Sequence, residues 1–170
     1  MKGTKRLAVL AMFTAIALTI FVAEAQIPPI VPIPGVKLGL ANIVTLIAMA
    51  LLGRRQAGEI LLVRIVLGSM FTGGVSAMLF SIAGGVFAYL IMCLTIRHFP
   101  ERLLWVVSVL AAFGHNAGQL LVAVWVTGTP SILVYAPALV AASVITGAFT
   151  GVAAMYLVRA LRKTGHFPQA

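Results

Sequence analysis

The chain has 170 residues, of which 62% are hydrophobic and 9% are charged, and its mean hydropathy is +1.13. Because a soluble globular domain has about 25% charged residues, this composition excludes a soluble domain and predicts an integral membrane protein. The sequence contains twelve Lys and Arg residues but only three Glu residues, and it contains no Asp. The basic residues are spread over chain ends and connections, which favours an anionic inner leaflet over nucleic acid as their counterpart.

Long apolar runs predict an all-α integral membrane fold with six transmembrane helices in one domain, residues 1–170. The runs are apolar on every face, unlike the short alternating segments of a membrane β-barrel. Spanning takes about 20 residues, so the second and third runs are short. The first connection contains four prolines, which exclude helix there. The predicted spans cover residues 7–25, 38–53, 57–71, 75–96, 103–126 and 131–158.

Ten of the twelve basic residues, all except Lys37 and Arg64, fall at the two chain ends and in every second connection. This positive-inside pattern predicts a multi-pass protein of the cell membrane with both termini in the cytoplasm. An alternative for the first apolar run is a cleaved signal peptide ending at residues 23–25, although the run is longer than the usual core of about 7–15 residues. The ten residues are Lys2, Lys5, Arg6, Arg54, Arg55, Arg97, Arg102, Arg159, Arg162 and Lys163.

Small residues recur at every fourth position of the first span, beginning with Ala11 and Ala15. Such a stripe lets helix backbones approach closely in lipid. It serves either packing within this protein's own bundle or docking of another membrane subunit.

Polar residues inside apolar spans are costly and are candidate functional residues. Arg64 lies well inside the third span, with Glu59 five residues earlier at a poor helical spacing for a pair. Its expected partners are Glu24, backbone carbonyls or a ligand anion. A structural ion pair and ligand binding are both open for Arg64.

The fifth span contains His115 and Gln119 on one helix face, with Asn116 about 100° away. These side chains suit recognition of a polar ring or headgroup, and hydrogen bonding between helices is the alternative. No second His, Cys or carboxylate lies at ligand spacing, so no metal site is predicted.

Lys37 is the basic residue that departs from the topological pattern by lying in an outer connection. We expect it to open the second helix, whose N-terminus favours anions, with Asn42 about one turn later. A lysine reaching the membrane surface is the alternative. The predicted substrate-binding residues, expected to line one outward-facing cavity for a polar or anionic solute, are Lys37, Asn42, Arg64, His115, Asn116 and Gln119.

These segments resemble the substrate-binding S components of energy-coupling factor (ECF) transporters, in particular the group labelled Gx transporter or heptaprenyl diphosphate synthase component I. The resemblance covers about residues 5–158 and is carried by Lys5-Arg6, residues 34–42, Arg64 and residues 114–120. It implies that Ala11 and Ala15 contact a transmembrane coupling subunit. It also implies that ligand binds from the outer side, with the proline-rich first connection as a lid.

The function expected from these features is that of a transport subunit without catalytic activity. The chain has no Gly-rich phosphate loop followed by Lys and Ser/Thr, so ATP would be used by two partner ATPase subunits and no cofactor is expected here. Prenyl transfer relies on acidic clusters that hold Mg²⁺, and three scattered Glu residues do not supply them. The alternative is a non-transport membrane subunit of a flavin- or quinone-linked electron-transfer or isoprenoid pathway.

Overall fold

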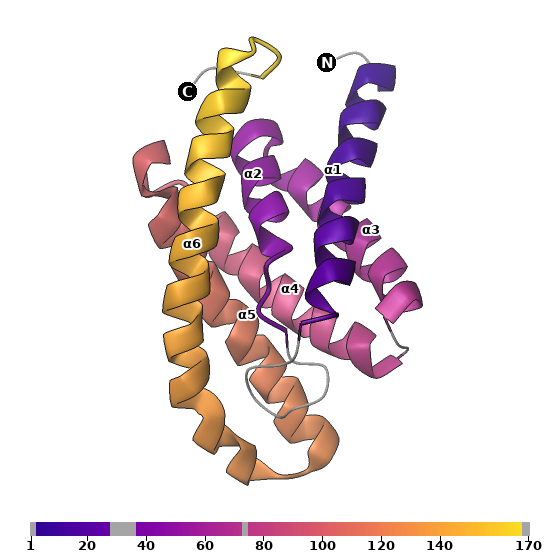
Figure 1. Ribbon diagram of the computed structural model, residues 1–170, viewed down its shortest axis with the longest axis vertical. Helices are drawn as coiled ribbons and strands as arrows, with labels where there is room; N and C mark the ends of the chain where they lie inside the picture. Colours follow the sequence, from indigo (N-terminus) through magenta and orange to yellow (C-terminus); the bar gives the residue numbers. More distant parts are fainter. Residues whose placement is uncertain (1–2, 28–36, 73–74, 168–170) are drawn as a thin grey trace.

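The computed structural model describes residues 3–27, 37–72 and 75–167, and over these ranges it is helical (Figure 1). The predicted lid and its four prolines lie almost entirely outside the described residues. Six α-helices are present in the described ranges, which agrees with the predicted number. In chain order they are α1 (Gly3–Glu24), α2 (Asn42–Leu52), α3 (Arg54–Thr72), α4 (Val75–Thr95), α5 (Leu104–Thr127) and α6 (Ala136–Lys163), with short 3₁₀ helices η1 (Glu101–Leu103) and η2 (Pro130–Tyr135) before α5 and α6.

Four of the described helices are long and apolar enough to cross a membrane: α1, α4, α5 with η1, and α6 with η2. The other two differ from them for different reasons. Helix α2 is apolar but has only 11 residues. Helix α3 has 19 residues, and its three arginines and Glu59 lower its mean hydropathy.

The second helix begins later than the sequence predicts. We expected Lys37 to open it, but residues 37–39 are not helical, residues 40–41 form a turn and α2 starts at Asn42. Gly39 has a φ of 80°, in the left-handed region that favours glycine. Lys37 therefore precedes the helix instead of sitting at its N-terminus, and that prediction was wrong.

Helix α5 packs between α4 and α6, while α1 packs chiefly against α3. Glycines allow the closest approaches. A Cβ added at Gly151 of α6 would lie 2.4 Å from the Cα of Trp105 in α5, and one at Gly147 would lie 2.6 Å from the Cα of Val109. No side chain fits at these positions, so α5 and α6 meet backbone to backbone.

Both chain termini lie at the same end of the bundle (Figure 1). Ion pairs join the basic segments at this end. Nη2 of Arg6 in α1 lies 3.1 Å from Oε2 of Glu59 in α3. Nε of Arg162 in α6 lies 3.1 Å from Oε2 of Glu101 in η1. The basic segments at the two chain ends, between α2 and α3, and between α4 and α5 therefore meet at one end of the molecule.

Candidate functional site

A cluster of buried polar side chains lies at the opposite end of α1 from the N-terminus. It draws on the end of α1, the segment before α2, the middle of α3 and the middle of α5. Five of its residues are almost fully buried, with exposed fractions of 4% for Glu24, 8% for Asn42, 3% for Arg64, 4% for His115 and 1% for Gln119. Five of the six predicted binding residues, including the half-buried Lys37, thus lie in this polar cluster, together with Glu24.

Asn42 connects the arginine of α3 to the histidine of α5. Nη2 of Arg64 donates to Oδ1 of Asn42 at 3.5 Å, and Nδ2 of Asn42 lies 3.1 Å from Nδ1 of His115. Because an arginine can only donate, Oδ1 of Asn42 is the acceptor and Nδ2 is the donor. Nδ1 of His115 then accepts, which places the proton of the neutral imidazole on Nε2.

The non-helical segment before α2 is held by two side chains far away in the sequence. The backbone N–H of Lys37 donates to Oε1 of Gln119 at 3.1 Å, and the backbone N–H of Gly39 donates to the carboxylate of Glu24. These bonds connect this segment to α5 and to α1.

Two cations lie against one aromatic ring. Nζ of Lys37 is 3.6 Å from the centroid of the Phe21 ring, and Cζ of Arg64 is 5.5 Å from it, both within the range of cation–π attraction. Glu24 is the acid that attracts both cations. Burial lowers the pKa of the Lys37 ammonium, and the Glu24 carboxylate opposes that shift. With His115 neutral, two cations and one carboxylate leave the polar cluster with a net positive charge.

Three donors of the polar cluster have no acceptor in hydrogen-bonding geometry among the described residues. They are Nζ of Lys37, Nε of Arg64 and Nε2 of His115. Buried polar groups are normally hydrogen-bonded. Donors of this kind, in a site of positive charge, are suited to a ligand that carries acceptors.

Glycines on two elements make room for the imidazole. A Cβ at Gly84 of α4 would lie 2.6 Å from Cε1 of His115, and a Cβ at Gly39 would lie 2.8 Å from its Cδ2. The ring is therefore confined from two sides by backbone that carries no side chain.

The structure separates Asn116 from the other five predicted residues. Its Nδ2 donates to the backbone oxygen of Leu139 at 3.1 Å and to Oγ of Ser143 at 2.8 Å, both on α6. The expectation that Asn116 shares a cavity with His115 does not hold, because residues adjacent on a helix point about 100° apart. Asn116 connects α5 to α6.

Two contributors to the polar cluster, Glu24 and Phe21, were not predicted as site residues. Glu24 was expected as a partner of Arg64 but not as a site residue, although an acid at the end of an apolar run is a visible signal. Phe21 gave no signal, since an aromatic residue in an apolar helix is ordinary.

The predicted docking residues Ala11 and Ala15 are exposed on α1. They border a groove of about 510 Å³ between α1 and α3, which is lined mainly by apolar side chains. The apolar wall on α3 includes Val63 and Leu67, whose exposed fractions are 46% and 36%. This groove is open on the surface, and α1 is therefore not enclosed by its own bundle on this side.

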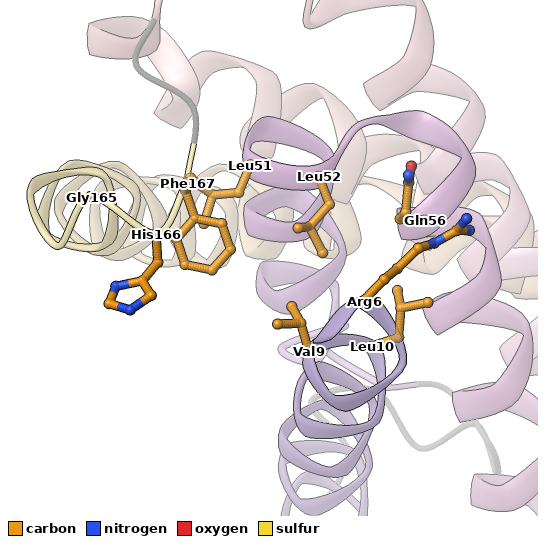
Figure 2. Close-up of a pocket in the computed structure, with 9 residues that line it drawn as sticks. All are labelled: Arg6, Val9, Leu10, Leu51, Leu52, Gln56, Gly165, His166 and Phe167. Atoms are coloured by element: carbon orange, nitrogen blue, oxygen red, sulfur yellow. The ribbon is translucent and has the colours of Figure 1, made fainter. Parts of the chain in front are cut away.

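A larger cavity, of about 620 Å³, lies at the end that carries the termini (Figure 2). Arg6, Gln56 and His166 contribute its polar groups, and the rest of its wall is mainly apolar. Arg6 is already engaged with Glu59. This cavity is separate from the polar cluster, which lies near the other end of α1.

The carboxylates stay apart. Glu24 lies in the polar cluster, Glu59 pairs with Arg6 and Arg55, and Glu101 pairs with two arginines of α6. Within the described ranges no three His, Cys, Asp or Glu side chains gather at a potential metal site. This arrangement does not provide the acidic cluster that would hold Mg²⁺ around a diphosphate.

A family model described as Heptaprenyl diphosphate synthase component I matches residues 13–157. The chain belongs to this family. The match runs from Phe13 in α1 into the last turns of α6 and includes every residue of the polar cluster. Comparison with curated proteins and with solved structures gives no match.

Membership confirms the family predicted from residues 34–42, Arg64 and residues 114–120. The family name mentions a synthase component, and the three carboxylates of the chain lie in separate places. Together with the four membrane-capable helices, the family supports a multi-pass membrane protein.

Proposed function

We propose that this protein is the substrate-binding membrane subunit of an ECF-type importer for a small polar or anionic solute. The observation that carries the proposal is the division of α1. One end of this helix supplies Phe21 and Glu24 to the buried polar cluster. Nearer its start it presents the exposed Ala11 and Ala15 beside an open apolar groove. A helix so divided can connect solute binding to contact with a partner.

The proposed solute site consists of Lys37, Asn42, Arg64, His115 and Gln119. An anionic group such as a carboxylate or a phosphate would accept from the donors on Lys37, Arg64 and His115 that have no acceptor among the described residues. Charge-assisted hydrogen bonds of this kind are about twice as strong as neutral ones. The positive charge of the polar cluster supports an anionic solute over a cationic one.

The proposed orientation places the termini and their basic residues in the cytoplasm of a cell-membrane protein. The polar cluster then lies in the outer half, on the side from which an importer takes up its solute. A lid formed by the first connection remains part of the proposal. Reorientation against a coupling subunit would be driven by two partner ATPases, because this chain has no phosphate-binding loop of its own.

The docking half of the proposal is tested by affinity purification from the native host. We expect the wild-type chain to retain a membrane coupling subunit and two ATPases, and the double variant Ala11→Trp with Ala15→Trp to lose them. The matched control replaces the exposed Ala138 and Ala141 of α6 with Trp. Redox proteins in place of ATPases would support the electron-transfer alternative and overturn the proposal.

The binding half is tested on the same preparations. Small molecules released on denaturing the purified protein are identified by mass spectrometry and expressed per mole of protein. We expect an anionic compound to be released from the wild type and from the double variant Ala11→Trp with Ala15→Trp. We expect this compound to be absent from Arg64→Ala. Equal retention by Arg64→Ala would place the solute elsewhere.

A further inference from the structure

A charged pocket lies at the end that carries the termini, away from the polar cluster. It has a volume of about 410 Å³ and lies where the ends of α2, α4 and α6 meet the starts of α3 and α5. We call it the arginine pocket. Its lining includes the three arginines Arg54, Arg97 and Arg162, one acid, Glu101, and the apolar side chains of Ile96 and Phe99.

The acid of the arginine pocket is already paired. Oε2 of Glu101 lies 3.1 Å from Nε of Arg162, and Oε1 lies 3.9 Å from Nε of Arg159. Nη2 of Arg162 also donates to the backbone oxygen of Ala50 at 3.2 Å. Glu101 and Arg162 therefore form a fixed wall that joins α6 to η1 and α2.

Arg54 and Arg97 supply the remaining charge. Nη2 of Arg54 is buried and has no hydrogen-bond acceptor among the described residues, although its backbone oxygen accepts from the Tyr89 hydroxyl at 3.0 Å. No acidic partner of Arg97 is found in the described part of the chain, and its residue is exposed. Three arginines against one glutamate leave the lining with two uncompensated positive charges.

The surroundings favour a phosphate over a simple halide. Guanidinium groups match phosphate oxygens with paired hydrogen bonds. The apolar wall of Ile96 and Phe99 lies beside these charges and suits the apolar part of an amphiphilic ligand.

We propose that the arginine pocket binds a phosphate group, with Arg54 and Arg97 as its charged contacts. Two sources share this chemistry: the headgroup of an anionic phospholipid, and free inorganic phosphate. Basic pockets between helices at the cytoplasmic side of membrane proteins bind anionic headgroups in this way. The proposal does not depend on which solute the polar cluster binds.

The test compares the full-length wild-type chain with a pocket variant and a control of equal charge. The pocket variant is Arg54→Gln with Arg97→Gln. The control is Arg55→Gln with Arg102→Gln, because both of those arginines are exposed and neither lines the pocket. Native mass spectrometry measures retention of phosphatidylglycerol against phosphatidylcholine, and thermal unfolding in lipid-free detergent measures stabilisation by inorganic phosphate.

Loss of two charge-assisted contacts should weaken binding by about tenfold or more in the pocket variant alone. Selective retention of phosphatidylglycerol identifies a headgroup site, whereas stabilisation by inorganic phosphate identifies a site for the free ion. Equal weakening in the pocket and control variants would show only diffuse surface charge and overturn the proposal. Absence of both effects in the wild type would also overturn it. The single variant Arg97→Gln, at an exposed position, serves if the double variant does not fold.

Discussion

The contact between Gly84 and His115 can be tested by adding one methyl group. In Gly84→Ala the new Cβ would lie 2.6 Å from Cε1 and 2.7 Å from Nδ1 of His115. The imidazole has little room to retreat, since its other edge faces the backbone of Gly39, where an added Cβ would lie 2.8 Å from Cδ2. Displacing the ring would also break its 3.1 Å contact with Nδ2 of Asn42.

The expected loss of stability follows from three contributions. Overpacking costs about 1–3 kcal/mol, and the lost hydrogen bond costs about 1 kcal/mol. Replacing glycine by alanine within a helix returns about 0.5–1 kcal/mol. The net expectation is a decrease of about 2 kcal/mol in the free energy of unfolding.

The adjacent Gly85 provides a matched control. A Cβ there would meet Cδ1 of Leu61 and Cδ1 of Ile65, each at 3.2 Å, which are the mobile ends of aliphatic side chains. Gly85→Ala gains the same helix propensity and meets no confined ring. We therefore expect its stability to stay within about 1 kcal/mol of wild type.

Thermal unfolding can be followed through the single thiol of the chain, because Cys93 is partly buried in α4. A thiol-reactive fluorophore then reports unfolding as the thiol becomes accessible. A difference of 2 kcal/mol corresponds to a Tm roughly 4–8 °C lower for Gly84→Ala than for Gly85→Ala. Equal Tm values for the two variants would refute the placement of His115 against Gly84.

Two further substitutions test the charges and the geometry of the polar cluster. Glu24→Gln should lower the free energy of unfolding by about 3–5 kcal/mol, because it leaves a buried cation without its counter-charge. The control Glu59→Gln, in a partly exposed ion pair, should lower it by about 0–1 kcal/mol. Equal Tm values for the two variants would contradict the buried location of Glu24. Asn116→Ala should lower the free energy of unfolding by about 1–2 kcal/mol, because it loses its hydrogen bonds to α6, while the co-purified small molecule should stay bound. Loss of that molecule, measured by mass spectrometry, would show that Asn116 belongs to the solute site.

The sequence identified which polar residues are unusual but not how they are oriented. Arg64, His115 and Gln119 stand out because polar groups are rare in apolar helices. Their meeting with Asn42 depends on how α3 and α5 are rotated about their axes, which no local pattern specifies. The spacing of four residues correctly placed His115 and Gln119 on one face, and the same helical geometry turns Asn116 toward α6.

The start of α2 could not be predicted from local sequence. Residues 38–41 are apolar or glycine and continue smoothly into the helix. The backbone N–H groups of Lys37 and Gly39 instead bond to Gln119 and Glu24, which are distant in the chain. Such competition between local helix formation and distant acceptors is visible only in the folded molecule. The roles of Gly39 and Gly84 are hidden for the same reason, because each is defined by the imidazole that it accommodates.

The shortness of α2 has a consequence for the evolution of this family. Eleven residues rise about 16 Å, which is roughly half of a hydrocarbon core of about 30 Å. In a membrane, the peptide groups of the non-helical segment that continues beyond the helix need hydrogen-bond partners other than water. Gln119 and Glu24 provide two of them and so complete the backbone of a neighbouring segment. Family members that carry apolar residues at both positions should therefore have a second helix that begins about one turn earlier.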